Sequence, residues 1–197
     1  MRRSAVMCVL MISLLLSGCQ TAGDTKGPQE QALVIRGKYL DSVGCTAKMD
    51  VTADYGQRVY TYTVDVSVTQ EETVLTVVAP QELAGITARV NEEGSRLEYD
   101  GAMLETGLLD EDGLTPLNAV PVLLESARSG FMDSCTLEQL GEQETLRVLC
   151  RDPECSAGQG RETTLWFHAQ THALVRGEIA VDGYRVILCD FLQFSLL

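Results

Sequence analysis

Alternation of apolar and polar residues is the strongest pattern in the chain. From Tyr60 to Val68 every second residue is apolar, and the positions between them carry Thr, Asp or Ser. Successive side chains of a strand leave on opposite faces, so this period predicts a strand with one buried and one solvated face. Short connections between such segments favour an antiparallel meander. The predicted strands are 45–53, 58–69, 73–78, 86–90, 96–99, 135–140, 145–150, 163–168, 174–181 and 184–194.

Two segments show helical spacing instead. Residues 30–43 place apolar side chains three or four positions apart and end at Gly44. Residues 115–129 open with Thr115-Pro116, typical of a helix start, and stop at Gly130. Pro121 lies inside this second segment and predicts a kink. Its apolar surface predicts packing on the concave side of the sheet, with Leu123 and Leu124 against residues 60–68. The pattern as a whole indicates an α+β fold.

The N-terminus carries an export pattern. A basic Met1-Arg2-Arg3 and an apolar run at 5–16 precede Leu16-Ser17-Gly18-Cys19, which looks like a bacterial lipobox. An ordinary secretion signal with a chance cysteine is the other reading. The lipobox predicts that residues 1–18 are a signal peptide, that Cys19 receives a diacylglyceryl group, that 19–29 form a flexible tether and that 30–197 form the folded domain. We therefore expect attachment to the outer face of the bacterial cytoplasmic membrane.

Charge narrows the class of partner. The formal net charge is −13. Removal of residues 1–18 would also remove the positive charges of Arg2 and Arg3 and make the chain more acidic still. Nucleic-acid binding needs a basic face and is not expected. An acidic surface is also not attracted to anionic lipid headgroups, so membrane attachment would depend on Cys19.

Candidate chemistry is sparse. His168 and His172 stand four apart, a zinc spacing on a helix, but the three residues between them indicate a turn. The acidic segment 110–113 lacks the later ligands of a calcium loop. The sequence contains neither a Gly-x-Ser-x-Gly nor a P-loop nor a dinucleotide fingerprint, and no nucleophile–base set. We predict no catalytic residue, no metal and no cofactor, hence a protein that is not an enzyme.

Cysteines allow two interpretations. An exported chain can form disulfides, and Cys150 and Cys155 flank a short polar loop, which makes them the candidate pair. Five cysteines follow Cys19, so at least one stays unpaired or pairs between chains. Cys45 and Cys189 could instead be small buried apolar residues on strands.

Several short sequence segments resemble the LolA/LolB-like lipoprotein-carrier superfamily, and the resemblance covers residues 30–194. They are Thr76-Val77-Val78-Ala79-Pro80, Leu83-Ala84-Gly85, Leu97-Glu98-Tyr99-Asp100-Gly101, Leu165-Trp166-Phe167, Leu174-Val175-Arg176 and Asp182-Gly183-Tyr184. His168 departs from the family, which usually has Asp there. The resemblance implies a curved antiparallel half-barrel whose concave face and helices enclose an apolar cavity for acyl chains. Within the superfamily the chain looks similar to lipoproteins of Gram-positive anaerobes, among them a spore-germination lipoprotein that partners a cortex amidase.

Two functions are consistent with this resemblance. The first is a lipoprotein that binds lipid or acyl chains, or handles lipoproteins, through the concave cavity. The alternative is a non-enzymatic envelope scaffold for a partner protein such as a cell-wall (spore cortex) amidase. The candidate cavity residues are Tyr60, Tyr62, Val64, Val66, Leu117, Val120, Leu123 and Leu124. Trp166 and Phe167 are neighbours in a strand, so one ring should face inward and the other outward.

Overall fold

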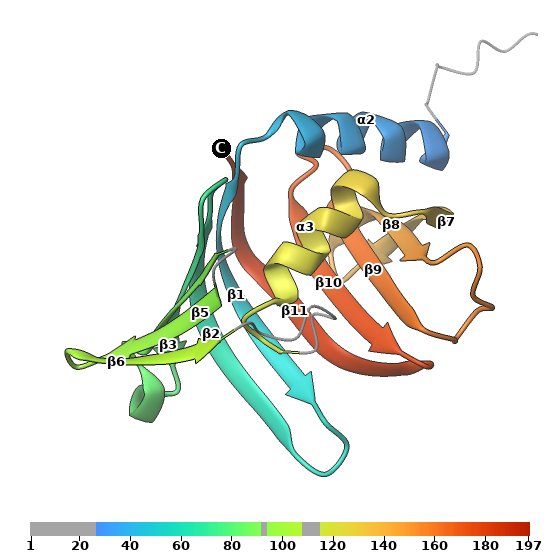
Figure 1. The fold of residues 1–197 in the computed structure, drawn as a ribbon. Helices are drawn as coiled ribbons and strands as arrows, with labels where there is room; N and C mark the ends of the chain where they lie inside the picture. Colours follow the sequence, from blue (N-terminus) through green and yellow to red (C-terminus); the bar gives the residue numbers. More distant parts are fainter. Residues whose placement is uncertain (1–26, 92–93, 108–114) are drawn as a thin grey trace, which may run out of the picture.

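A single curved sheet makes up most of the molecule (Figure 1). The computed structural model describes residues 27–91, 94–107 and 115–197; the predicted signal peptide, Cys19 and the acidic segment 110–113 lie outside these ranges. The elements are α2 (Pro28–Asp41), β1 (Cys45–Asp54), β2 (Val59–Val68), β3 (Thr73–Ala79), a 3₁₀ turn η1 (Gln81–Leu83), β4 (Thr87–Asn91), β5 (Gly94–Tyr99), β6 (Ala102–Gly107), α3 (Ala119–Ser129), β7 (Met132–Leu140), β8 (Gln143–Arg151), β9 (Arg161–His168), β10 (Leu174–Val181) and β11 (Tyr184–Leu196).

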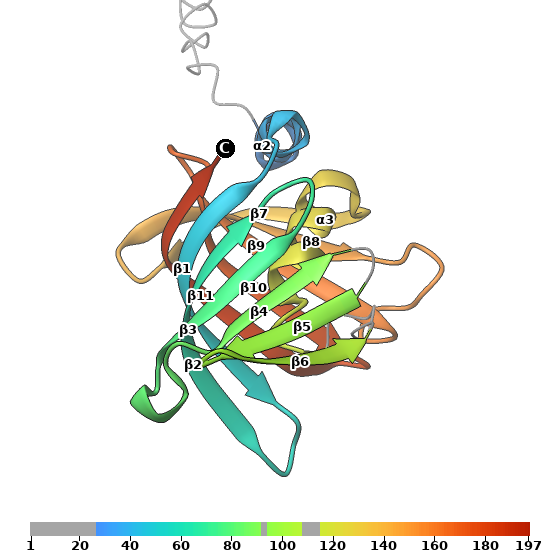
Figure 2. The ribbon, with the colours of Figure 1, turned by 60° about the vertical axis from the view of Figure 1, so that its left-hand side comes forward.

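The sheet consists of two meanders joined edge to edge. Its eleven described strands run in the order β6-β5-β4-β3-β2-β1-β11-β10-β9-β8-β7, each antiparallel to its neighbour. The chain passes from the first meander to the second through α3, and β11 returns to pair with β1. The sheet curves around α3, while α2 lies across one end (Figures 1 and 2). The predicted α+β half-barrel is confirmed.

Strand register builds the core. Val64 on β2 lies opposite Met49 on β1, and Val51 on β1 lies opposite Cys189 on β11. Residues directly opposite each other share one face of a sheet, so the alternation seen in the sequence becomes one apolar concave face. Tyr39 of α2 is fully buried against this face, where its hydroxyl donates a 3.1 Å hydrogen bond to the carbonyl oxygen of His172.

The helices differ from the sequence prediction at their ends. α3 begins at Ala119 rather than at Thr115, so Pro121 falls in the first turn. An N–H in the first turn has no intrahelical partner, and proline therefore removes no bond there; the predicted kink is wrong. α2 ends at Asp41, before Gly44. A Cβ on Gly44 would stand 2.0 Å from the carbonyl oxygen of Val68, so close approach to β2, and not helix termination, requires this glycine.

One strand lies outside the predicted set. Residues 102–107, for which no strand is predicted, form β6 at one edge of the sheet.

Within the part of the chain that the structure describes, neither helix has the length and apolar character needed to cross a bilayer.

Candidate functional site

Helix α3 covers one half of the concave face. Its main contacts with the sheet are to β9 and β10, and Leu123 lies directly on Gly177 of β10. A Cβ built on Gly177 would stand 2.6 Å from a Leu123 Cδ atom. The prediction placed Leu123 and Leu124 against residues 60–68; the structure sets Leu123 on β10, where the absence of a side chain at position 177 lets the helix approach the sheet. Val120, Leu123 and Leu124 of α3 are between 0% and 2% exposed.

The other half of the concave face, over β2–β6, carries a continuous apolar row. Register places one residue of each strand in line across the sheet: Phe194, Ala47, Val66, Leu75, Ala88, Leu97 and Leu104. Val66 is 4% exposed, Leu97 is half-buried, and Leu104 on the edge strand is 62% exposed. The row thus leads from the core to the surface.

Tyrosine rings line the open end of the same face. Tyr55 follows β1, and its ring centroid lies 6.2 Å from that of Tyr60. Tyr60 stacks on Tyr62 at 6.4 Å, with 10° between the ring planes. Burial, and to a smaller extent the neighbouring side chains of Tyr62 and Tyr60, raise the pKa of Tyr55, so its hydroxyl stays neutral around pH 7. Together these three rings form what we call the tyrosine ladder.

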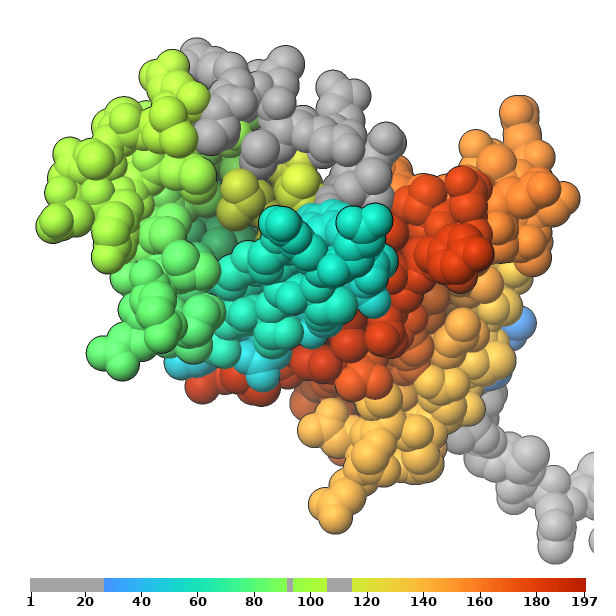
Figure 3. Space-filling model, turned by 90° about the horizontal axis from the view of Figure 1, so that it is seen from below, coloured from blue at the N-terminus to red at the C-terminus, as the bar shows by residue number. Residues whose placement is uncertain are grey.

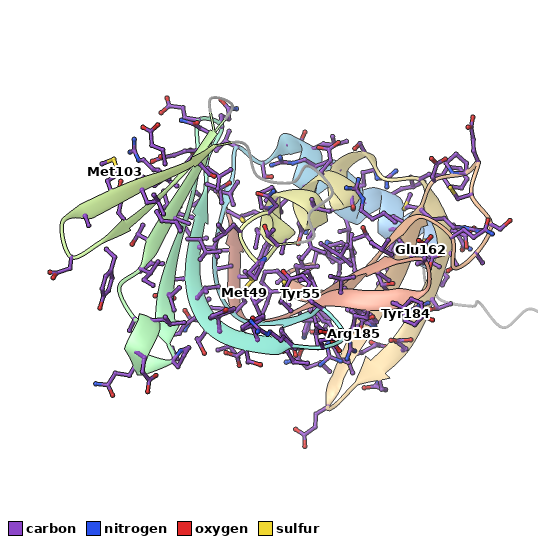
Figure 4. All side chains as sticks on the ribbon, turned by 60° about the horizontal axis from the view of Figure 1, so that its bottom comes forward. Met49, Tyr55, Met103, Glu162, Tyr184 and Arg185 are labelled. Carbon is purple, nitrogen blue, oxygen red and sulfur yellow. The ribbon has the colours of Figure 1, made fainter. Side chains whose placement is uncertain are left out.

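A cleft of about 710 Å³ lies beside the tyrosine ladder. It separates the β1–β2 turn from the β10–β11 turn, and Figure 4 shows Tyr55 and Tyr184 on these neighbouring ends of the sheet. Seen from this end, the molecule is also hollowed between the strands β3–β6 and the end of the β1–β2 hairpin (Figure 3). The cleft is lined by Asp54, Tyr55, Gly56, Val181, Gly183, Tyr184, Arg185 and Val186.

The predicted cavity residues fall into two groups. Val64, Val66, Val120, Leu123 and Leu124 are between 0% and 4% exposed and belong to the closed core. Tyr60 is 38% exposed, and Tyr62 and Leu117 are half-buried, so these three border the accessible part of the concave face. Tyr55 and Tyr184 are not among the predicted cavity residues. The signal that could have found them is a tyrosine at or beside each of two hairpin turns.

The candidate disulfide is not formed in the structure, where Cys150 and Cys155 are both free. Strand alternation turns Cys150 toward the concave side, where its thiol lies 3.7 Å from the carbonyl oxygen of Ser126. Cys155 instead lies in the loop beside Gly160. Burial raises the pKa of the Cys150 thiol to about 11, against a smaller lowering by Arg36.

The histidine pair forms a turn. The Nδ1 atom of His168 accepts hydrogen bonds from the backbone N–H groups of Gln170 and Thr171, both at 3.2 Å. His172 adopts a left-handed backbone conformation with φ of 66°. Over the residues that the structure describes, no group of three or more His, Cys, Asp and Glu side chains could hold a metal ion.

Trp166 occupies the convex face and is 7% exposed, whereas Phe167 faces the core. The indole N–H donates to the Glu138 carboxylate, and the Arg147 guanidinium lies 5.7 Å from the ring centroid. The outward ring is thus covered by its own neighbours on the sheet.

Comparison with known proteins finds likeness in structure. No protein-family model matches the chain, and no curated protein matches it. A LolA superfamily protein from Nitrosomonas europaea is similar, with 10% identity, 88% of this chain and 94% of that chain covered, and a TM-score of 0.41. The lipoprotein LppX of Mycobacterium tuberculosis is 14% identical, with 85% of this chain and 92% of that chain covered and a TM-score of 0.46. A chain of the CwlD amidase–GerS lipoprotein complex of Clostridioides difficile is 13% identical, with 90% of this chain and 99% of that chain covered and a TM-score of 0.41.

Proposed function

We propose that this chain is an extracytoplasmic, lipid-anchored protein that binds acyl chains on the β2–β6 half of its concave face. The observation that carries the proposal is the apolar row that emerges from the core and ends at Leu104. Each methylene group removed from water contributes about 0.8 kcal/mol, so even part of an acyl chain laid along this row would bind measurably. No chemical step is required, in line with the prediction that the chain is not an enzyme.

Binding is testable with a dansyl-labelled fatty acid and two variants of neighbouring residues. Leu97→Gln places a polar group in the apolar row, while Arg96→Gln alters the adjacent side chain on the convex face. We expect the dissociation constant to rise about tenfold for the first variant, equivalent to about 1.4 kcal/mol, and to stay within about twofold for the second. Equal affinities of all three proteins would refute binding in this row.

Anchoring belongs to the same proposal and is tested separately. Cys19→Ser removes the acceptor of the diacylglyceryl group, and we expect an unprocessed or released protein in membrane fractionation. Mature Cys19→Ser protein that remains in the membrane fraction would rule out attachment through this residue.

The scaffold function has one observation in its favour. Tyr99, Met103 and Leu104 at the β5–β6 edge are between 51% and 62% exposed, and a partner protein could bury them. A cell-wall amidase from the same cell is the partner to test. Its retention by the purified chain, lost in Met103→Asp, together with absent fatty-acid binding would favour the scaffold over the lipid-binding function.

A further inference from the structure

The cleft between the two hairpin ends exists because strand pairing stops there. β1 and β11 pair as far as Ala53 opposite Ile187. Beyond this pair the β1–β2 hairpin and the β10–β11 hairpin continue separately, and the cleft of about 710 Å³ opens between them. Ligand pockets commonly measure about 300–1,000 Å³, so the volume suits a small ligand or part of a larger one.

The rings at the cleft are unusually accessible. Tyr184 is 78% exposed and Tyr55 is 46% exposed, and both line the cleft. Tyrosine has an apolar ring and a polar tip, which suits a position where one end of a ligand is apolar and the other is wet. Val181 and Val186 complete an apolar wall, and charged groups, Asp54 and Arg185, stand at its margin.

The tyrosine ladder connects the cleft with the core. Tyr60 lies opposite Ala53, and Tyr62 opposite Val51, so both rings belong to the concave face. The next residue on that face of β2 is Val64, which is 1% exposed. Among the described residues, Tyr60, Tyr62 and Val64 therefore form an apolar path along this face of β2, from the ring of Tyr55 to the start of the apolar row.

We propose that this cleft is the mouth of the acyl-binding face, and that its ligand is a single-chain amphiphile. The acyl tail lies along the tyrosine ladder toward Val64, and the polar head stays between the hairpin ends, beside Tyr184. This inference rests on the proposed function, since it assigns the entry point and the orientation of the ligand on the same face.

Ring removal tests the mouth by equilibrium titration of the mature chain with the dansyl-labelled fatty acid. In Tyr55→Ser and Tyr184→Ser the ring is lost and the hydroxyl kept; the matched control is Phe131→Ser, which removes another exposed ring, just before β7 in the other half of the sheet. We expect the double variant Tyr55→Ser/Tyr184→Ser to raise the dissociation constant about tenfold and the control to change it less than about twofold. Thermal unfolding at the wild-type temperature would show that both variants are folded. Unchanged affinity in the folded double variant would refute the assignment of the cleft as the mouth of the acyl-binding face.

Photolabelling tests the orientation directly. A fatty acid with a diazirine beside its carboxyl group should label residues 54–56 and 181–186, and one with a diazirine at the tail end should label the concave face of β2–β5. Labelling of Tyr99 and Leu104 by the carboxyl-end probe would place entry at the sheet edge and overturn the proposal, although lipid binding itself would stand. A wild-type chain that binds neither probe would overturn both.

Discussion

Arg36 and Arg128 cap each other's helices. Arg36 of α2 donates to the carbonyl oxygens of Ala127, at 3.3 Å, and of Gly130 at the end of α3. Arg128 of α3 donates to the carbonyl oxygens of Tyr39, at 2.9 Å, and of Ser42, at 3.3 Å, at the end of α2. The last carbonyls of a helix have no partner within it and carry the negative end of its dipole, so two guanidinium groups fix the helices to each other.

Loss of either arginine should loosen both helices. We expect Arg36→Met and Arg128→Met each to lower the free energy of unfolding by about 1.5–3 kcal/mol, the range for hydrogen bonds to charged groups. Urea denaturation followed by circular dichroism measures this. Arg58→Met, at an exposed turn, is the control and should change stability by less than about 0.5 kcal/mol. If all three variants unfold at one urea concentration, the mutual capping contributes nothing.

Contact between α3 and β10 depends on Gly177. Gly177→Ala brings a methyl group to 2.6 Å from Leu123, and overpacking of this kind lowers stability by about 1–3 kcal/mol. Gly37→Ala is the matched control, because nothing lies within 4 Å of the added Cβ and alanine favours a helix by about 0.5–1 kcal/mol. Opposite shifts of the melting temperature are expected. A Gly177→Ala protein as stable as Gly37→Ala would mean that the helix does not sit on β10.

Strand β2 should tolerate charge on one face only. Val64→Asp places a carboxylate in a site that is 1% exposed, and an unpaired buried charge can remove the whole stability of a small domain, about 5 kcal/mol or more. Thr61→Asp on the solvated face should be nearly neutral. Thr63 is unsuitable as a control, because its hydroxyl donates to the Asp50 carboxylate at 2.7 Å and an acid there would repel it. Similar thermal shifts for Val64→Asp and Thr61→Asp would reverse the face assignment.

Thiol reactivity should separate Cys155 from the buried cysteines. The reactive species is the thiolate, and burial raises the pKa of Cys45 and of Cys150 to about 11, so both stay protonated at neutral pH. Cys155 is only half-buried. We expect a thiol reagent to label Cys155 alone, among the cysteines from residue 27 onward, in the folded protein, as read by peptide mass spectrometry. A Cys150–Cys155 disulfide would leave both residues unlabelled until reduction.

Local pattern was sufficient to predict every described strand except β6. Alternation in β1 and β2 and the Asp182-Gly183 turn depend only on neighbours in sequence, and the strands lie where these signals stand. The position of α3 on β10 was not predictable in this way. It depends on Gly177, more than fifty residues beyond Leu123 in sequence, and a glycine within a strand does not by itself reveal which side chain approaches it.

In the candidate site, too, some residues could be predicted from their neighbours in sequence and others depend on tertiary contact. Tyr60 and Tyr62 were found because they alternate within one strand. Tyr184 was missed because it comes within reach of Tyr55 only after β11 has paired with β1, a pairing of the two ends of the chain. The mutual capping by Arg36 and Arg128 is likewise a product of tertiary contact.

Native mass spectrometry of the mature chain, released from its membrane in mild detergent, tests acyl binding most directly. We expect a bound acyl lipid in addition to the one that we propose is attached to Cys19, retained in Arg96→Gln and lost in Leu97→Gln. A wild-type protein whose mass is that of the lipidated chain alone, under conditions that preserve non-covalent lipid complexes, would contradict it.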